Sequence, residues 1–268
     1  MKVVIFCGGQ GLRLRDYSEN IPKPMVPVGY RPIVWHLMKY YAHYGHKEFI
    51  LCLGYRADAI KEYFLNYNEC TSNDFVLTEG GRNLKLMAND ISDWKITFVD
   101  TGTEACIGER LMQIKEHIGD DEYFMCNYAD CLTDAPLPQM IETFQQSGKI
   151  GSFLSVRPGY SWHAVRVDNQ GTVVDLVDAD KTDVWINGGY LMFRKDVFNY
   201  FEAGNDIVPT VFRKLAAEQK LMTYRHDGFW ACMDTFKEKM TLDDLDAKGR
   251  APWQVWKKPK IVHQKRPA

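Results

Sequence analysis

Hydrophobic residues in the first part of the chain alternate between apolar runs and helical spacing. Residues 2–7 form a run that is apolar after Lys2, which is typical of a strand buried on both faces of a parallel sheet. Residues 32–44 carry apolar side chains at the spacing of a helix. The two patterns repeat, predicting strands at 49–53, 95–99 and 123–127 and helices at 57–67, 108–117 and 137–146. This alternation predicts an α/β fold with an open, mostly parallel sheet and helices on both faces.

The pattern changes after residue 150. Strand-like segments follow at 152–156, 164–167, 172–177 and 185–193, and helical stretches at 207–218 and 235–247. They predict a small β-rich extension of the sheet or a cover over a site. Because the chain shows no internal repeat and no long linker, we expect a single domain over residues 1–256. Residues 257–268 are basic and contain proline, which predicts a mobile tail, with a contact arm or an ordinary solvated end as the alternatives.

The composition restricts the classes of protein that fit. The chain has 268 residues, 46% of them hydrophobic, which is enough for one large core. A formal net charge of −2 argues against a nucleic-acid binder and against a basic membrane-surface protein. No apolar run approaches the ~20 residues that cross a bilayer, and the apolar start is too short for a signal peptide.

The cysteines indicate a reducing compartment. Their number is odd and they lack the paired spacing of a zinc site. The seven are Cys7, Cys52, Cys70, Cys106, Cys126, Cys131 and Cys232. Several lie in apolar, strand-like runs, where a cysteine usually acts as a small buried hydrophobic residue. We therefore expect a cytoplasmic protein.

A glycine-rich turn follows the first predicted strand. Gly8, Gly9 and Gly11 would let backbone N–H groups approach a phosphate chain closely, and Arg13 would add a positive charge. The spacing matches neither the dinucleotide-binding pattern GxGxxG nor the triphosphate loop GxxxxGKS. An ordinary tight turn is the alternative.

Lys23 lies between two prolines in the segment Pro22-Lys23-Pro24-Met25-Val26-Pro27-Val28-Gly29. Because proline restricts the backbone, the ammonium group would stand on a stiff support. A preorganised cation suits phosphoryl transfer, in which charge accumulates on phosphate oxygens. A surface lysine in a proline-rich loop is the alternative for this motif alone, but its occurrence shortly after the glycine turn favours a phosphate site.

The glycine turn and the proline-flanked lysine are followed along the chain by further short motifs. The later segments are Pro32-Ile33-Val34-Trp35-His36, Gly54-Tyr55-Arg56, Ile60-Lys61-Glu62-Tyr63-Phe64, Val99-Asp100-Thr101-Gly102, Ile186-Asn187-Gly188-Gly189, Gly228-Phe229-Trp230, Met233-Asp234-Thr235 and Ala251-Pro252-Trp253. Because these motifs occur in this order, the chain resembles the sugar-phosphate nucleotidyltransferases, and most closely the glucose-1-phosphate cytidylyltransferases. The resemblance extends to about Trp256. The resemblance implies a Rossmann-like nucleotidyltransferase sheet, with residues 1–150 binding the nucleotide and 151–256 the acceptor. It also implies a homo-oligomer.

Two aspartates are candidate metal ligands. Asp130 lies just past the predicted strand 123–127, at the end of an α/β sheet where ligands bind. Asp234 precedes a predicted helix, where it could instead be the N-cap. Mg²⁺ prefers oxygen ligands, commonly one or two carboxylates, and the resemblance implies that Asp130 and Asp234 hold it. The family's usual Tyr-Gly-Asp-Gly is replaced here by Tyr128-Ala129-Asp130-Cys131.

The resemblance also implies the nucleotide. Asp100-Thr101-Gly102 and Gly108-Glu109-Arg110-Leu111 are the segments that favour CTP, with Thr101 and Arg110 among the nucleotide-binding residues. By the same resemblance Arg110 contacts the triphosphate. The alternative for Arg110 is an arginine on a helix surface.

The expected acceptor pocket departs from the family pattern. The family usually carries Glu-Lys-Pro before Asn-Gly-Gly, whereas this chain reads Val177-Asp178-Ala179-Asp180-Lys181. Asp178 could take the place of the glutamate, and Lys181 that of the lysine only if the register shifts. The family's aromatic–glycine pair becomes Trp162-His163, and an imidazole there would fill space that a hexose occupies. A core histidine is the alternative for His163.

We therefore predict an enzyme that uses Mg²⁺ and transfers CMP from CTP to a sugar 1-phosphate, giving a CDP-linked product and pyrophosphate. Lys23, Arg13 and Asp130 are the predicted catalytic residues, and Asn187 and Gly188 join Trp162, His163 and Asp178 in the acceptor pocket. The departures leave open another small phosphate or phosphonate acceptor, or a catalytically silent regulator. A dehydrogenase would need an acidic residue closing the second strand, which ends instead in Gly54-Tyr55-Arg56.

Overall fold

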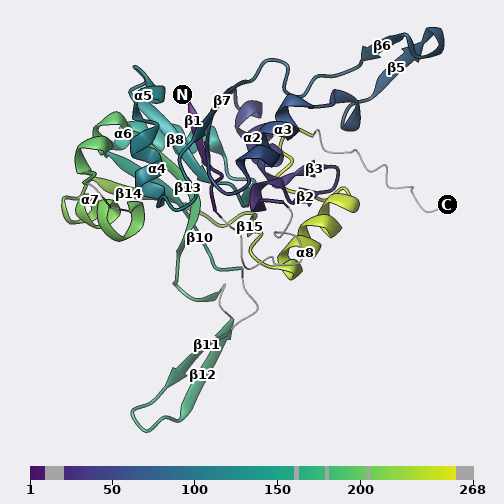
Figure 1. The fold of residues 1–268 in the computed structure, drawn as a ribbon. Coiled ribbons are helices and arrows are strands. Elements are labelled where there is room, and N and C mark those ends of the chain that lie inside the picture. Colours follow the sequence, from purple (N-terminus) through teal and green to yellow (C-terminus); the bar gives the residue numbers. More distant parts are fainter. Residues whose placement is uncertain (10–20, 160–162, 179–180, 203, 205, 258–268) are drawn as a thin grey trace, which may run out of the picture.

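The computed structural model describes residues 1–9, 21–159, 163–178, 181–202, 204 and 206–257. A seven-stranded sheet forms its centre, in the order β14-β10-β13-β8-β1-β4-β7 (Figure 1). The strands are β1 (Val3–Phe6), β4 (Glu48–Leu53), β7 (Lys95–Asp100), β8 (Tyr123–Tyr128), β10 (Gly151–Val156), β13 (Ile186–Arg194) and β14 (Leu221–His226). Only β13 runs antiparallel to its neighbours. The predicted α/β fold with a mostly parallel sheet is confirmed.

Strand β1 shows why the sheet is covered on both faces. Its four residues are all buried, and successive side chains of a strand point to opposite faces. Val3 and Ile5 belong to one apolar core, whereas Val4 and Phe6 belong to the other. A strand that is apolar on both faces is stable only between two layers, which explains the unbroken apolar run in the sequence.

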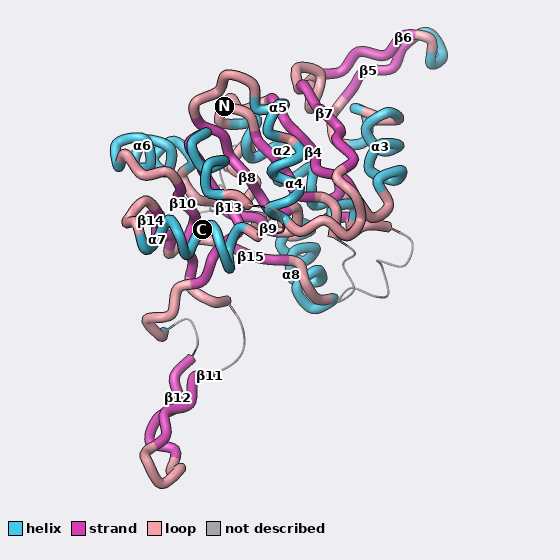
Figure 2. The backbone as a smooth tube through the Cα atoms, turned by 60° about the vertical axis from the view of Figure 1, so that its left-hand side comes forward, coloured by secondary structure: helices cyan, strands magenta, loops and turns pink. Residues whose placement is uncertain are grey.

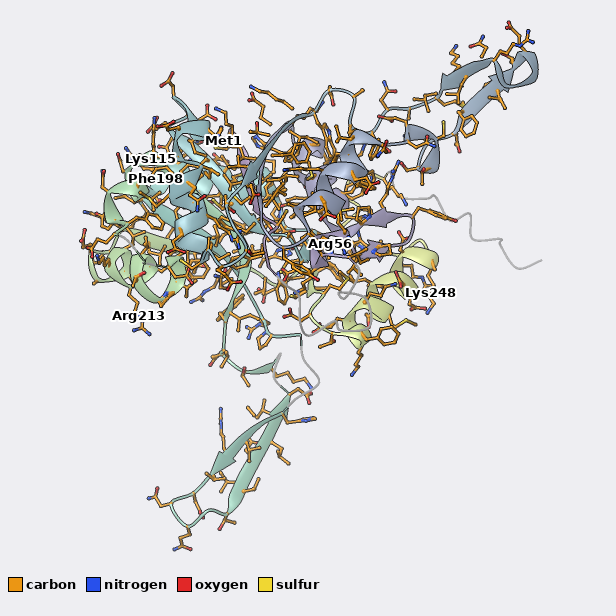
Figure 3. All side chains as sticks on the ribbon, in the orientation of Figure 1. Met1, Arg56, Lys115, Phe198, Arg213 and Lys248 are labelled. Carbon is orange, nitrogen blue, oxygen red and sulfur yellow. The ribbon has the colours of Figure 1, made fainter. Side chains whose placement is uncertain are left out.

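Two sets of helices supply these layers (Figure 2). The first core includes side chains of α2 (Ile33–His43), α3 (Ala57–Leu65), α6 (Leu137–Ser147) and α8 (Phe236–Ala247). The second includes α4 (Ile107–Gln113), α5 (Lys115–Ile118), η6 (Lys195–Tyr200), η7 (Ile207–Phe212) and α7 (Arg213–Ala217). The ammonium of Lys115 on α5 lies 5.5 Å from the ring of Phe198 on η6, and Figure 3 labels both residues. No helix among the described residues is long and apolar enough to cross a membrane.

Two hairpins project from the body of the molecule (Figures 1 and 2). One consists of β5 (Phe75–Thr78) and β6 (Asn83–Leu86), with the turn η4 (Glu79–Gly81) between them. The other consists of β11 (His163–Val167) and β12 (Val173–Asp178). The expected β-rich extension is therefore divided, because β10, β13 and β14 widen the sheet whereas β11 and β12 pair only with each other.

Several elements differ from the sequence-based expectation. The hairpin β5–β6 was not predicted, since its short strands pack on no core and show no buried face. Strands β9 (Cys131–Thr133) and β15 (Trp230–Cys232) pair across about 100 residues of sequence, so no local pattern reveals them. A single helix over 108–117 is wrong, because α4 ends at Gln113 and α5 starts at Lys115.

His36 joins helix α2 to two distant segments. Its side chain is buried, and its Nε2 lies 2.9 Å from the carbonyl oxygen of Val28. Trp253 Nε1 donates to its Nδ1 at 3.3 Å. Because the indole nitrogen only donates, Nδ1 must be the acceptor and Nε2 carries the proton. Burial lowers the pKa of His36 to about 4, since a second proton on Nδ1 would be desolvated and would face the Trp253 N–H.

This pKa predicts a pH-dependent stability. The unfolded chain takes up a proton at His36 below a pH of about 6.5, whereas the folded protein does so only near pH 4. The free energy of unfolding should therefore fall as the pH is lowered through this window, by about 3 kcal/mol in total for His36. His36→Gln keeps a donor and an acceptor without titrating, so its slope should be flatter in urea denaturation at a series of pH values. Equal slopes of the free energy of unfolding against pH in the two proteins would contradict this prediction. Burial also lowers the pKa of His46 to about 4, but His46 contributes equally to both proteins.

Candidate functional site

Lys23 is held on a rigid turn. It opens η2 (Lys23–Met25), and the turn is closed by a bond from the Met25 amide to the Pro22 carbonyl oxygen at 2.8 Å. Pro24 on its other side is buried. The Lys23 ammonium donates to Asp130 Oδ2 at 2.5 Å and also to Asp234 Oδ1. The structure thus brings together the cation and the two acidic side chains that the sequence analysis singled out.

Strand pairing between β9 and β15 positions the two aspartates. Asp130 lies between β8 and β9, and its carbonyl oxygen accepts from the Met233 amide at 2.9 Å. Asp234 follows directly in the sequence. The N-cap of α8 is Thr235, whose hydroxyl oxygen accepts from the Glu238 amide. The alternative that Asp234 caps this helix is therefore wrong, and its carboxylate lies against Lys23 instead.

The electrostatics of this cluster favour a bound cation. Burial alone would lower the pKa of Lys23, but the charge of Asp130 and hydrogen bonds to both carboxylates raise it above its ordinary value. One oxygen of each carboxylate contacts the same ammonium nitrogen, which shows that the two carboxylates together can hold a positively charged group. Carboxylate oxygens from two separate segments are also the donors that Mg²⁺ prefers. Asp130 and Asp234 therefore fit a divalent metal.

A cleft of about 600 Å³ opens beside the cluster. It lies beyond the carboxyl ends of β1 and β8, which is where open α/β sheets bind ligands. Its described lining consists of Phe6, Gly8, Gly9, Lys23, Pro24, Thr103, Glu104, Ala105, Cys106, Ile107, Arg110, Tyr128, Ala129, Asp130, Asp206 and Asp234. Two of the predicted nucleotide-binding glycines and all three members of the charged cluster thus line one cavity.

Arg110 is buried under this cleft. Its guanidinium donates to Thr101 Oγ1 at 2.7 Å and to the carbonyl oxygens of Leu53 at 3.1 Å and Gly8 at 3.4 Å. The alternative of a surface arginine is wrong, since the side chain is 3% exposed. Thr101 is also buried and donates to the Leu53 carbonyl oxygen at 2.7 Å. Arg110 and Thr101 thereby join the ends of β1, β4 and β7.

The predicted acceptor residues fall into two groups. Asn187 and Gly188 lie on β13, where Asn187 Oδ1 accepts from the Gly189 amide and Gly188 O accepts from Trp230 Nε1 at 2.8 Å. His163 and Asp178 face each other at the base of the β11–β12 hairpin, with His163 Nε2 3.2 Å from Asp178 Oδ1. Neither His163 nor Asp178 lines the cleft described above. A core position for His163 is wrong, because its side chain is 57% exposed.

Three predicted site residues, Gly11, Arg13 and Trp162, lie outside the described residues, as do Ala179 and residues 258–268 of the predicted tail. Lys181 bonds to Asp178 at 2.5 Å, and this hydrogen bond lowers the pKa of Asp178.

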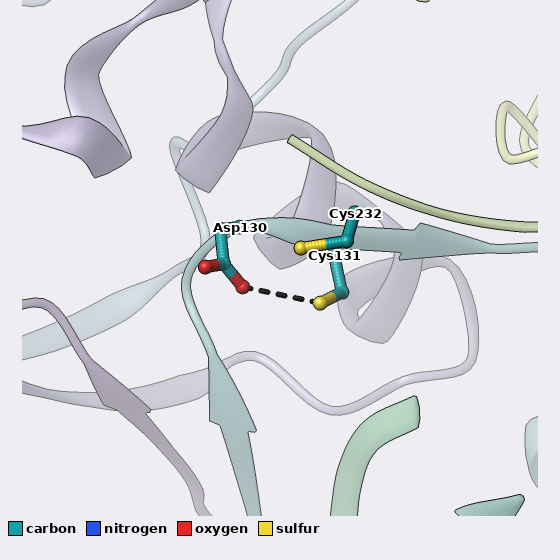
Figure 4. Close-up of side chains that lie close together, drawn as sticks. All are labelled: Asp130, Cys131 and Cys232. Carbon is teal, nitrogen blue, oxygen red and sulfur yellow. Dashed lines mark hydrogen bonds between the residues drawn. The ribbon is translucent and has the colours of Figure 1, made fainter. Parts of the chain in front are cut away.

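Sequence reasoning missed three residues near the cluster. Asp206 lines the cleft and accepts from the amides of Gly108 and Ile207. Cys131 and Cys232 lie beside Asp130 (Figure 4). A hydrogen bond with Cys232 and burial both raise the pKa of the Cys131 thiol. The only sequence signal was the replacement of a family glycine by Cys131; no local pattern links it to Cys232.

The chain is similar to known nucleotidyl transferases over most of its length. The family model described as nucleotidyl transferase matches residues 2–238. The glucose-1-phosphate cytidylyltransferase of Salmonella typhimurium is 35% identical over 260 residues, covering 96% of this chain and 100% of that protein. The D-glycero-alpha-D-manno-heptose 1-phosphate guanylyltransferase of Campylobacter jejuni is 29% identical over 202 residues, covering 75% of this chain and 79% of that protein.

Solved structures share the fold at low sequence identity. A UDP-glucose pyrophosphorylase complexed with UDP-glucose has a TM-score of 0.66 at 17% identity, covering 93% of this chain and 99% of that one. HddC from Yersinia pseudotuberculosis has a TM-score of 0.62 at 19% identity, covering 91% of this chain and 98% of that one. These neighbours support the Rossmann-like α/β architecture.

The contact between Gly8 and Arg110 gives a test of the cleft floor. A Cβ atom at Gly8 would lie 2.0 Å from Arg110 Nη1, so Gly8→Ala should lower the free energy of unfolding by about 1–3 kcal/mol. The penalty should shrink by more than about 1 kcal/mol in an Arg110→Ala background, because the clashing group is gone. Gly9→Ala is the matched control, since a Cβ there meets no described atom within 4 Å. Additive effects in a denaturation double-mutant cycle would overturn this account of the floor.

Proposed function

Since this chain belongs to the nucleotidyl transferase family, we propose that it transfers CMP from CTP to a sugar 1-phosphate, giving a CDP-linked sugar and pyrophosphate. The observation that carries the proposal is the Lys23 ammonium held between Asp130 and Asp234 at a cleft lined by the glycine turn. The choice of CTP and of a sugar 1-phosphate is supported by the cytidylyltransferase relative.

In the proposed reaction, a phosphate oxygen of the acceptor attacks the α-phosphorus of CTP in line with the leaving group. The new oxygen–phosphorus bond forms as the bond from the α-phosphorus to the bridging oxygen breaks, and pyrophosphate leaves with that electron pair. Lys23 binds phosphate oxygens and stabilises charge that develops on them. The acceptor phosphate is already a nucleophile once positioned, so no covalent enzyme intermediate is needed.

Each predicted nucleotide-binding residue has a proposed place. Gly8 and Gly9 line the cleft, where their backbone amides would approach the phosphates, and Gly11 and Arg13 would continue that contact. Thr101 and Arg110 would shape the cleft from below, since their polar atoms bond the ends of three strands. Asp130 and Asp234 would hold Mg²⁺, which when bound neutralises phosphate charge and aligns the reacting groups.

The acceptor is proposed to bind next to the same aspartate. Gly188 and Trp230 are in direct contact, and β15, which carries Trp230, pairs with β9 just after Asp130. We therefore assign Asn187 and Gly188 to the acceptor pocket. His163 and Asp178 extend this proposal to the base of the β11–β12 hairpin. Trp162, which lies outside the described residues, is proposed to contact the acceptor as well. In this arrangement residues 1–150 bind the nucleotide, and residues 151–256 bind the acceptor and contribute Asp234 to the proposed metal site.

We also propose a homo-oligomer in the cytoplasm. Both hairpins, which project from the body of the molecule in Figure 3, carry exposed apolar side chains, including Leu77 at 55%, Val167 at 58% and Leu176 at 62%. Exposed apolar surface of this kind marks contacts between proteins, and copies of this chain are the proposed partners. All seven cysteines are free, which suits a reducing compartment.

A substrate screen tests the function. With Mg²⁺ present, pyrophosphate release should be fastest for CTP with glucose 1-phosphate or a related sugar 1-phosphate, and slower with the other nucleoside triphosphates. Including non-sugar phosphates and phosphonates distinguishes the alternative acceptors that the departures at Ala179 and His163 suggest. Silence with every acceptor and every nucleotide would contradict the proposal and favour a nucleotide-binding regulator.

The role of Lys23 is tested by its removal. Lys23→Ala should lower kcat at saturating Mg²⁺ by at least about 10²–10³-fold, because a preorganised positive charge is lost from the transition state. Circular dichroism should show a folded protein. Lys95→Ala is the control, since that lysine is 74% exposed on edge strand β7 and pairs with Glu48. Near-normal turnover in Lys23→Ala would remove Lys23 from the mechanism.

A further inference from the structure

Two cysteines face each other across the strand pair that carries the aspartates. In the antiparallel pair β9–β15, Cys131 lies opposite Cys232. The neighbouring pair of residues, Asp130 and Met233, is joined by a hydrogen bond from the Met233 amide to the Asp130 carbonyl oxygen. Because hydrogen-bonded and non-hydrogen-bonded pairs alternate in an antiparallel ladder, Cys131 and Cys232 form a non-hydrogen-bonded pair. Side chains lie closest in such pairs. Both sulfur atoms and an Asp130 carboxylate oxygen lie within 4.8 Å of one another (Figure 4).

The Asp130 carboxylate faces two ways. Its Oδ2 accepts from the Lys23 ammonium at 2.5 Å, whereas its Oδ1 accepts from Cys131 Sγ at 3.1 Å. The oxygen beside the sulfur atoms is therefore not the one bound to Lys23. Two sulfurs and one oxygen within a few ångströms of each other form a ligand set for a metal.

The donor chemistry selects the metal. Mg²⁺ takes oxygen ligands and avoids sulfur, whereas Zn²⁺ binds cysteine sulfur and aspartate oxygen and is stable with three protein ligands and one open position. On binding, the metal would displace the two thiol protons to solvent. The two thiolates and the carboxylates of Asp130 and Asp234 would then carry four negative charges, of which a divalent ion and the Lys23 ammonium would offset three. We propose that Cys131, Cys232 and Asp130 form a second metal site, for a thiophilic divalent cation such as Zn²⁺, and that its occupation inhibits the transferase.

Access and consequence follow from the same positions. Cys131 is 4% exposed, but Cys232 is only partly buried and Asp130 lines the cleft, so two of the three ligand residues are accessible to an ion. An ion bound there engages Asp130, one of the two carboxylates proposed to hold Mg²⁺. Inhibition therefore rests on the proposed function, whereas binding of the metal does not.

Binding is tested with Co²⁺, which reports sulfur ligation through a charge-transfer band. In a phosphine reductant, one equivalent of Co²⁺ should produce this band in the full-length protein, and Zn²⁺ should abolish it. Since loss of an outer-shell partner alone lowers metal affinity about 10- to 100-fold, Cys131→Ser or Cys232→Ser should weaken binding at least as much. Cys70→Ser, a partly buried cysteine in η3 (Glu69–Thr71), is the matched control and should keep the band.

The outcomes separate the parts of the proposal. Absence of the band in the unmodified protein, or its persistence in Cys232→Ser, would overturn the site. Because Cys232 is only partly buried, Cys232→Ser is expected to fold even if Cys131→Ser does not. With activity established at excess Mg²⁺, added Zn²⁺ should inhibit the unmodified protein and the Cys70→Ser control but not Cys232→Ser. Equal inhibition of all three would overturn the inhibitory role. A protein that binds Co²⁺ through sulfur yet transfers no nucleotide would refute the proposed function alone.

Discussion

Two carboxylates from distant segments share one ammonium group in this structure. The oxygens of Asp130 and Asp234 that contact Lys23 are at most about 5 Å apart, because both bond to the same nitrogen. At an effective dielectric constant of about 20, like charges at this separation repel by about 3 kcal/mol. A cation between the two carboxylates offsets this repulsion, and the Lys23 ammonium supplies it. The strand pair β9–β15 and the proline-flanked turn have to converge for this contact to form, so the cluster constrains the whole carboxyl edge of the sheet.

The floor of the cleft depends on a second buried cation. Arg110 donates to carbonyl oxygens at the ends of β1 and β4 and to the Thr101 hydroxyl at the end of β7. Gly8 leaves the space that its guanidinium occupies. The absence of a side chain at Gly8 therefore leaves room for the Arg110 guanidinium below the turn as well as for a ligand above it. Both cations line the cleft: the Arg110 guanidinium bonds to the strand ends, and the Lys23 ammonium bonds to the two carboxylates.

The sequence predicted what local patterns encode. Apolar runs such as β1 identified the strands buried on both faces, and the Pro22-Lys23-Pro24 motif identified a rigid cation. Features that depend on pairing between distant segments were missed. The hairpin β5–β6 has no buried face, and the opposition of Cys131 and Cys232 follows from a strand pair of only three residues each. The sequence also does not show that the donors of Arg110 face backbone carbonyl oxygens and the Thr101 hydroxyl.

The central claim is that Lys23, Asp130 and Asp234 surround one triphosphate and one metal. The most direct measurement is a crystal structure with a non-hydrolysable CTP analogue and Mn²⁺, whose anomalous scattering locates the metal. The account predicts an anomalous peak on the Asp130 and Asp234 carboxylates, with the triphosphate over Gly8 and Gly9 and within reach of Lys23. A nucleotide bound elsewhere, or a metal that contacts neither aspartate, would contradict it.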